Sequence, residues 1–250
     1  GDKALPYFPI EEANPFLGWR GLRVTLDHPE IFLSQVRAML KANIGLGNLR
    51  IMLPMVSNLT ELQEALDLVD RSYKELSQEG FELPPKPPIG VMIEVPAAVY
   101  QARAIARRVD FLSVGSNDLT QYLLAVDRNN ARVADLYHAF HPAVLQALQQ
   151  VVSAAQKESK PVSICGELAG DPAAAILLTA MGFDALSMNS ISLPRVKKAL
   201  RSVSLAEARQ LLDEVLLFDY SDQTQARLHD FLRSRGMEQF LPLDLESVRH

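Results

Sequence analysis

Five short, nearly all-apolar runs, separated by segments with helical periodicity, constrain the fold of this chain more than any other feature. The runs cover residues 49–56, 89–95, 110–116, 161–167 and 185–190. Strands that are apolar on both faces are typical of parallel sheets covered by helices, whereas half-exposed strands alternate apolar and polar residues. The sequence therefore predicts an α/β domain with a parallel sheet, which is either a barrel or an open doubly wound sheet.

The segments between these runs contain helix start and stop signals. One helix is predicted from Thr60, and Gly80 is placed to end it. In "GDPAAAILLTAMG", Asp171 is the predicted N-cap, Pro172 the first helical residue and Gly182 the stop. Further helices are predicted from Pro142, across residues 97–108 and beyond residue 204, so strands and helices alternate along most of the chain.

Composition narrows the functional classes. The chain has 250 residues, of which 48% are hydrophobic, and a formal net charge of -5. The absence of a lysine- or arginine-rich block argues against a nucleic-acid partner, and no apolar run reaches the ~18 residues of a membrane span. The first residues lack the layout of a signal peptide. Cys165 is the only cysteine, which excludes a disulfide framework and favours a reducing cytoplasm.

Polar residues follow the predicted strands at the points where the strands end. In α/β sheets and barrels the ligand binds at the carboxyl ends of the strands, so residues from separate segments meet at one rim. The rim predicted here is formed by Glu94, Asn117, Asp118, Cys165, Gly166, Glu167, Asn189 and Ser190. The usual nucleotide-binding glycine motifs do not occur.

Two carboxylates of this rim are candidate Mg²⁺ ligands. Mg²⁺ prefers oxygen donors and keeps water or substrate phosphate in its remaining positions. Glu94 or Asp118 alone is better explained as a cap of the helix that follows it. Both carboxylates at one rim favour a metal site.

Arg20, Arg128 and Asn117 are candidate anion-binding residues. An arginine presents a planar fork of donors that fits phosphate or carboxylate. Each arginine taken alone is better explained as part of a surface ion pair, and Asn117 alone as a turn residue. Their proximity to the two carboxylates favours a shared site for a metal and a phosphate.

Cys165 leaves two interpretations open from the residues alone. A lone cysteine is commonly a small buried hydrophobic residue. At a strand end before Gly166, it is also placed to act as an acid or a nucleophile.

The segment "GSNDLTQYLLAVDRNN" resembles the G-T-N-D-L-T-Q-Y-x-L-A-V-D-R motif of the phosphoenolpyruvate-protein phosphotransferases, the enzyme I family of the bacterial phosphotransferase system. "GDKALPYF", "NPFLGWRGLR", "IMLPMV", "GVMIEVPAA", "ICGELAGD" and "LSMNSISLPRVK" match this family in the same order, from residue 1 to about residue 200. "EVPAAVYQA" and "FHPAVLQAL" resemble the nitrogen-branch paralogue more than the sugar enzyme. Phosphoenolpyruvate synthase and pyruvate phosphate dikinase share only the N-D-L-T-Q core, so they rank second.

The resemblance implies a TIM-like (β/α)₈ barrel that binds phosphoenolpyruvate and Mg²⁺. The phosphoryl group would pass to an active histidine and on to a histidine-phosphorylatable carrier protein, with pyruvate as the product. The resemblance also assigns a role to each candidate residue. Glu94 and Asp118 match the metal ligands, Arg20, Asn117 and Arg128 match the substrate-binding groups, and Cys165 matches the proton donor.

The departures from the family are equally informative. No segment matches the phosphorylated histidine, two further arginines are expected ahead of "GDK", and five predicted strands are fewer than the eight of a closed barrel. Residues 1–250 are therefore expected to form an incomplete C-terminal phosphoenolpyruvate-binding barrel domain, inactive alone and lacking the phosphohistidine domain. Exposed parallel strand edges need a cover, which either a dimer or a rearranged packing could provide. The resemblance implies a homodimer. A non-catalytic dimerisation or regulatory module is a third hypothesis.

Overall fold

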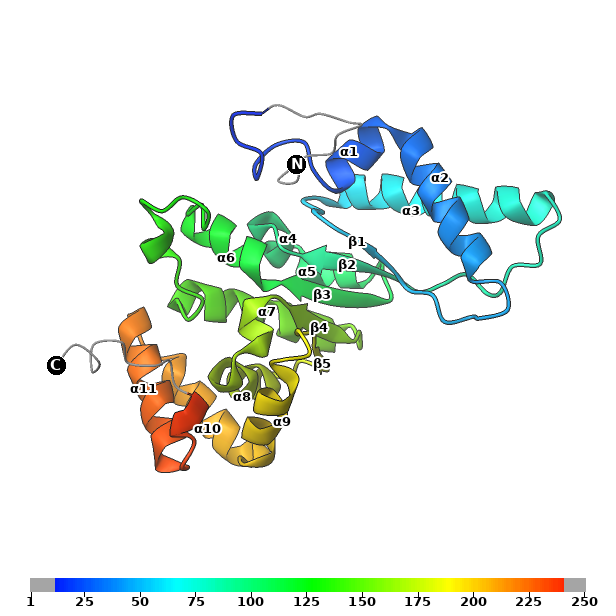
Figure 1. Cartoon of the computed structure of the whole chain (residues 1–250). Coiled ribbons are helices and arrows are strands. Elements are labelled where there is room, and N and C mark those ends of the chain that lie inside the picture. Colours follow the sequence, from blue (N-terminus) through cyan, green and yellow to red (C-terminus); the bar gives the residue numbers. More distant parts are fainter. Residues whose placement is uncertain (1–11, 241–250) are drawn as a thin grey trace. The chain divides into compact units, whose positions relative to one another are not determined.

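The structure, a computed structural model, describes residues 12–240 (Figure 1). The segment "GDKALPYF" therefore lies outside the described residues. The chain divides into two compact units. Unit 1 comprises residues 1–113 and 154–161, and unit 2 comprises residues 114–153 and 162–250.

A five-stranded sheet contains one strand from each of the predicted apolar runs (Figure 1). Its strands are β1 (Ile51–Leu53), β2 (Ile89–Ile93), β3 (Phe111–Gly115), β4 (Val162–Cys165) and β5 (Ala185–Leu186). In the parallel β1–β2 pair Ile51 lies opposite Ile89, and in the parallel β4–β5 pair Ser163 lies opposite Ala185. The predicted parallel α/β fold is confirmed, with strands shorter than the apolar runs that contain them.

The order of the strands decides between the two architectures that the sequence left open. The strands stand in sequence order, β1-β2-β3-β4-β5. An open doubly wound sheet reverses its strand order at a switch point, whereas a (β/α) barrel adds each strand beside the previous one. The described strands therefore follow the barrel pattern, and five of them form an incomplete barrel.

Unit 1 packs its helices around the first strands. They are α1 (Leu22–Asp27), α2 (Pro29–Ala42), α3 (Leu59–Gln78), α4 (Pro96–Tyr100) and α5 (Ala102–Ala106). Helix α3 begins one residue before the predicted Thr60, because the Asn58 side chain caps it by accepting from the Glu61 N–H at 2.9 Å. Gly80, with φ +89°, follows its C-cap as predicted. Leu62, Val69 and Leu76 bury one face of α3, which packs against α1 and α2.

Unit 2 contains the remaining helices, apart from residues 154–157 at the end of α7 (Pro142–Lys157), which belong to unit 1. They are α6 (Ser116–Leu124), α7 (Pro142–Lys157), α8 (Pro172–Met181), α9 (Leu193–Arg201), α10 (Leu205–Val215) and α11 (Ser221–Ser234), with short 3₁₀ turns η1 (Ala134–Leu136), η2 (Glu167–Gly170) and η3 (Glu238–Phe240). Asp171 caps α8 through the Ala174 N–H at 2.8 Å, and Gly182 ends it with φ +100°. The predicted signals of this helix are confirmed. Helix α8 is the central buried element, since α9, α10 and α11 all contact it.

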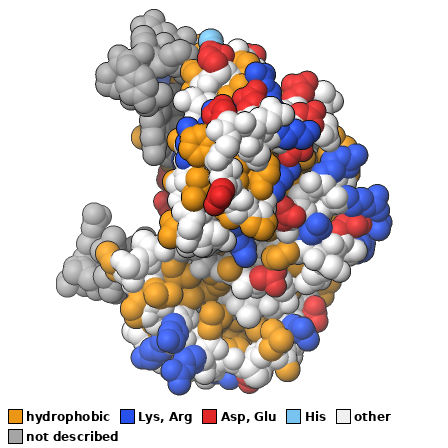
Figure 2. Space-filling view, turned by 90° about the vertical axis from the view of Figure 1, so that its right-hand side faces the viewer, with side chains coloured by type: hydrophobic (Ala, Val, Ile, Leu, Met, Phe, Trp, Pro, Cys, Tyr) orange, Lys and Arg blue, Asp and Glu red, His pale blue; other side chains and the backbone are white. Residues whose placement is uncertain are grey.

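The surface combines charged and apolar regions. On the face that Figure 2 shows, acidic and basic side chains are interspersed over much of the area, and hydrophobic side chains gather in another part. Large exposed apolar side chains of unit 2 include Ile191, Leu193, Leu217 and Tyr220. Within residues 12–240, no helix is long and apolar enough to cross a membrane.

Candidate active site

Glu94 follows the last residue of β2 and is buried in unit 1, with 4% of its surface exposed. Its Oε1 accepts the backbone N–H of Met55 at 2.7 Å. Helix α4 has Val95 as its N-cap and no side-chain cap bond, so the interpretation of Glu94 as a helix cap is wrong. The contact with the segment that follows β1 orients the carboxylate through the backbone.

Met55 also brings the segment of Arg20 to the same part of unit 1. Gly21, with φ +57°, lies so close to Met55 that an added Cβ would be 2.8 Å from the methionine Cβ. Arg20 is the residue before this glycine, and its guanidinium lies 5.7 Å from the centroid of the Phe16 ring. Gly21, the neighbour of Arg20, and the Glu94 carboxylate therefore both lie against Met55, which itself has the rare φ of +58° for a non-glycine.

Asp118 and Arg128, ten residues apart in sequence, meet in unit 2. Strand β3 continues directly into α6, which places Asp118 in the first turn of the helix. The Arg128 Nη1 donates to the Asp118 Oδ1 at 3.0 Å, and the Arg128 N–H donates to the Gln121 Oε1 at 3.2 Å. Helix α6 ends at Ala125 in a left-handed conformation with φ +53°, which reverses the chain towards Asp118. Asp118 and Arg128 therefore form an ion pair, the kind of contact that the arginine was expected to make if taken alone.

Asn117 contacts the turn formed by residues 165–167. Its Oδ1 accepts the Glu167 N–H at 3.1 Å. Asn117 lies within the first turn of α6, so its interpretation as a turn residue is wrong. Because a backbone N–H can only donate, the amide atom that faces it is the oxygen, and this bond orients the Nδ2 donors away from Glu167.

Cys165, the last residue of β4, is held at both its backbone and its side chain. Its carbonyl accepts the hydroxyl of Ser116 at 2.7 Å, and its Sγ lies 3.5 Å from the carbonyl oxygen of Val114. Cys165 is partly exposed. This disagrees with the alternative that it is a fully buried core cysteine. Gly166 has φ +100°, and a Cβ added there would lie 2.3 Å from the Ser116 Oγ.

Tyr137 is a member of this cluster that the sequence did not reveal. Its hydroxyl donates to the Asn117 carbonyl oxygen at 3.3 Å. Burial raises the pKa of Tyr137, while the neighbouring Thr120 hydroxyl and the charge of Arg128 act in the opposite direction. The sequence contained no signal for this residue, because its role depends on the loop after α6 folding back onto the helix. Ser116 and Met55 were missed because their partners, Cys165 and Glu94, are 49 and 39 positions away in the sequence.

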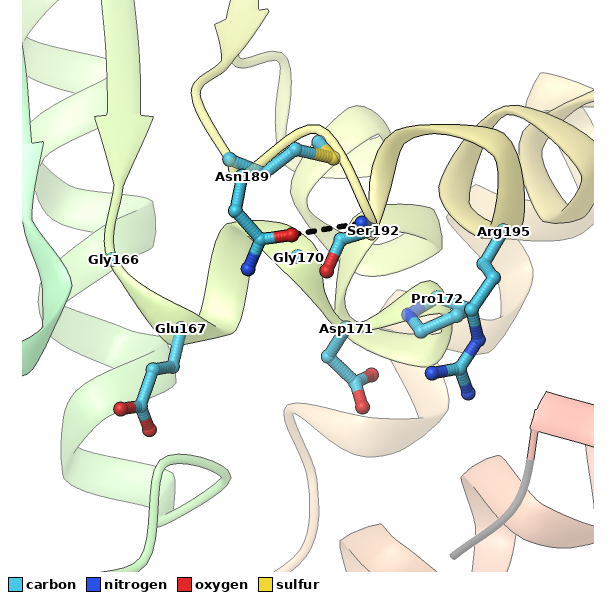
Figure 3. Close-up of a pocket in the computed structure, with 9 residues that line it drawn as sticks. Gly166, Glu167, Gly170, Asp171, Pro172, Asn189, Ser192 and Arg195 are labelled. Atoms are coloured by element: carbon cyan, nitrogen blue, oxygen red, sulfur yellow. Dashed lines mark hydrogen bonds between the residues drawn. The ribbon is translucent and has the colours of Figure 1, made fainter.

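A hollow of about 290 Å³ adjoins the 165–167 turn beyond the ends of β4 and β5 (Figure 3). Its lining consists of Gly166, Glu167, Gly170, Asp171, Pro172, Met188, Asn189, Ser192 and Arg195. The Oδ1 of Asn189 accepts the Ser192 N–H at 2.8 Å, and Figure 3 shows the Glu167 side chain pointing away from this pair. Burial raises the pKa of Asp171, although backbone hydrogen bonds from its helix lower it. Asn189, predicted at the rim, thus orders the loop before α9.

A solved structure supports the fold. The crystal structure of a citrate lyase from Burkholderia xenovorans LB400 matches this chain with a TM-score of 0.51 at 16% sequence identity. The match covers 87% of this chain and 73% of the other. Together with the parallel sheet, it confirms the predicted TIM-like architecture and nothing about activity.

Sequence relatives identify the family. The chain is 50% identical over 237 residues to a "Phosphoenolpyruvate-dependent phosphotransferase system" protein of Escherichia coli K12, covering 94% of this chain and 32% of that protein. It is 42% identical over 238 residues to the phosphoenolpyruvate-protein phosphotransferase of Haemophilus influenzae Rd, covering 95% of this chain and 41% of that one. The chain thus spans 32% and 41% of the length of these two relatives. Residues 1–205 match the family model for the phosphoenolpyruvate-binding domain of phosphoenolpyruvate-utilising enzymes, and the chain belongs to that family.

Proposed function

We propose that this chain is the C-terminal phosphoenolpyruvate-binding domain of a phosphoenolpyruvate-protein phosphotransferase. The whole protein would move the phosphoryl group of phosphoenolpyruvate to a histidine of another domain and on to a carrier protein, releasing pyruvate. The observation that supports this best is the cluster of Asn117, Asp118, Arg128 and Cys165 within unit 2 of a domain that belongs to this family.

Arg128 and Asn117 have the chemistry to hold the phosphate and carboxylate of the substrate. A guanidinium has five N–H donors in a fork, so an arginine that contacts Asp118 through Nη1 retains the geometry to bind an oxyanion. The Asn117 amide is oriented through its oxygen, which directs its two N–H donors elsewhere. Arg20 of unit 1 is assigned to the same anion on the basis of the resemblance.

Glu94 and Asp118 are the proposed carboxylate ligands of Mg²⁺. Residues 12–240 contain no group of three or more histidine, cysteine, aspartate or glutamate side chains suited to a metal. Two carboxylates nevertheless fit Mg²⁺, which in phosphoryl-transfer sites binds one or two of them and fills its other positions with water and substrate phosphate. When bound, the ion would offset the negative charge of the substrate oxygens.

Cys165 is the proposed proton donor. Loss of the phosphoryl group leaves an enolate, and protonation of its methylene carbon gives pyruvate. A thiol with an ordinary pKa of ~8.5 can release a proton to carbon and regain one from solvent in each cycle. The partial exposure of Cys165 is compatible with this exchange.

The rest of the proposed protein rests on the resemblance to the enzyme I family. The acceptor histidine is assigned to a separate domain, and a homodimer in the cytoplasm is proposed as the assembly. The relatives at 50% and 48% identity share 32% of their length with this chain, against 41% for the Haemophilus relative. The more similar proteins are thus the longer ones. Their extra length has room for an additional regulatory domain, which supports assignment of this chain to the nitrogen branch.

Binding of phosphoenolpyruvate by the 250-residue chain tests the proposal. A titration followed by ³¹P NMR should show binding that requires Mg²⁺ and that Arg128→Ala abolishes. Arg132→Ala is the matched control, since Arg132 is an exposed arginine of the same loop. Binding that is independent of Mg²⁺, or unchanged in Arg128→Ala, would contradict the proposal and favour a regulatory module.

The fate of the phosphoryl group separates the remaining alternatives. Phosphoenolpyruvate labelled in its phosphoryl group should leave no label on any histidine of this chain alone. Label on one of these histidines would refute the separate acceptor domain. In the full-length protein, transfer to AMP or phosphate instead of a histidine-bearing carrier would favour a synthase or dikinase.

A further inference from the structure

The turn that carries Cys165 is bonded to the first turn of α6 at the cysteine carbonyl and again two residues later. Ser116 donates its hydroxyl to the Cys165 carbonyl at 2.7 Å, and Asn117 accepts the Glu167 N–H at 3.1 Å. We propose that Ser116 is a positioning residue that sets the direction of the Cys165 thiol. The catalytic consequence of this positioning rests on the proposed proton-donor role of Cys165. The positioning itself is independent of that role.

The local sequence gives Ser116 another use that the structure does not adopt. A serine at the start of a helix commonly caps the first free N–H groups. Here Gly115 occupies the N-cap position without a side-chain bond, and the hydroxyl of Ser116 reaches the end of β4 instead. Ser116 is 2% exposed, so water cannot readily replace this bond.

Gly166 allows the first turn of α6 to lie close to the backbone of residues 165–167. A Cβ on this residue would lie 2.3 Å from the Ser116 Oγ and 2.8 Å from the Asn117 Oδ1. The first turn of α6 therefore packs directly on the backbone next to Cys165. Reorientation of the Cys165 peptide group, and with it of the Cα–Cβ bond that carries the thiol, would require the Ser116 bond to break. In the present conformation the Sγ lies 3.5 Å from the Val114 carbonyl oxygen.

The hydroxyl, not the serine as such, is the required group. The motif that this segment resembles has threonine at this place, which presents the same Oγ atom. Ser116→Thr and Ser116→Val thus form a matched pair, since the two new side chains have nearly the same shape and differ in the hydroxyl. Ser116→Ala provides a smaller side chain without the hydroxyl.

Alkylation of the 250-residue chain with iodoacetamide measures the positioning directly, because Cys165 is the only cysteine. Ser116→Val and Ser116→Ala should raise the rate about two- to tenfold, the population change that one hydrogen bond typically controls. Ser116→Thr should react like the parent chain. Ser72→Ala is the control, because Ser72 is a buried serine of unit 1 whose hydroxyl also donates to a backbone carbonyl.

Equal alkylation rates for Ser116→Thr and Ser116→Val would overturn the proposal. Failure of both variants without the hydroxyl to fold, by circular dichroism and thermal unfolding, would also overturn it, because Ser116 would then be a determinant of stability alone.

The catalytic consequence is measured in the full-length protein. Ser116→Val should slow the exchange of pyruvate methyl protons with D₂O and lower kcat, leaving the KM for phosphoenolpyruvate unchanged. If Cys165→Ser leaves this exchange unaffected, the proton-donor role fails while the alkylation result still decides the positioning.

Discussion

The two carboxylates assigned to the metal are held in different ways in the two units. Glu94 in unit 1 is buried and accepts a backbone N–H from Met55. Asp118 in unit 2 accepts a side-chain donor, and the Asp118 and Arg128 side chains remain 13% and 28% exposed. A backbone donor moves only with its segment, whereas an arginine side chain can exchange one oxyanion for another.

This difference indicates a division of tasks. Unit 1 supplies a carboxylate whose orientation is part of the fold, so that removing it should affect stability. Unit 2 supplies a carboxylate and an arginine that can separate when a phosphate competes for the guanidinium. Removing either of these should affect turnover more than stability.

The largest effect is expected from Asp118→Asn in the full-length enzyme. The phosphotransfer rate should fall by about 10³-fold or more, because charge stabilisation by a bound metal is worth several kcal/mol. The melting temperature should change little, since the asparagine oxygen can still accept from Arg128. Asp135→Asn, at an exposed position of η1, is the control. A nearly normal phosphotransfer rate in Asp118→Asn would contradict the proposal that Asp118 is a metal ligand.

Cys165→Ser should lower turnover by about 10²–10⁴-fold, the usual contribution of a general acid. Phosphoenolpyruvate and Mg²⁺ should bind as before, because a serine hydroxyl keeps the shape but is far less acidic. Rate, binding and thermal stability are measured on the same preparation. A loss of stability with normal turnover would return Cys165 to a purely structural role.

Gly166→Ala should destabilise unit 2 by about 2–5 kcal/mol, since left-handed strain adds to overpacking against Ser116. Gly80→Ala in unit 1 is the matched control. Gly80 has a similar φ of +89°, but nothing lies within 4 Å of an added Cβ. Gly80→Ala is therefore expected to lose only the backbone-strain part of this stability, about 1–2 kcal/mol. Denaturant unfolding measures both values, and equal losses would contradict the close packing at Gly166.

Glu94→Ala should cost about 1–3 kcal/mol, because the buried N–H of Met55 loses its acceptor. Glu94→Gln should cost less, since its amide oxygen can replace the carboxylate at this bond. Asp118→Ala should also cost less, because the partly exposed Arg128 can be hydrated. If Asp118→Ala proves as destabilising as Glu94→Ala, the contrast between the two units is wrong.

The smallest effect concerns acid sensitivity at the C-terminal helices of unit 2. Hydrogen bonds from Arg235 and Ser204 lower the pKa of Glu207 from 4.5 to about 2. Because the pKa is lower in the folded than in the unfolded chain, the ionised glutamate stabilises the fold when the pH is above the unfolded-state pKa. This stabilisation is lost as the pH falls from about 4.5 towards 2. The melting temperature of Glu207→Gln should therefore depend less on pH over this range than that of the parent chain. An unchanged pH profile would show that the interaction is negligible in solution.

The sequence alone determined the strands, several of the helices and the candidate positions. All five strands lie in the runs predicted from apolar composition, and α8 has the predicted cap, first proline and final glycine. These signals are local, because capping, left-handed glycine and burial on both faces depend on neighbouring residues. The prediction that Asp118 and Arg128 share one site also followed from residues close in sequence.

The tertiary structure alone decided which groups hold the site together. Strand order selected the barrel pattern over the doubly wound sheet, and the contacts of Met55, Ser116, Tyr137 and Gly166 gave these residues their roles. Each contact joins segments separated by about 20 to 50 positions. No local pattern records such a partner, because a hydroxyl or an N–H has the same propensities whichever distant carbonyl or carboxylate it eventually meets.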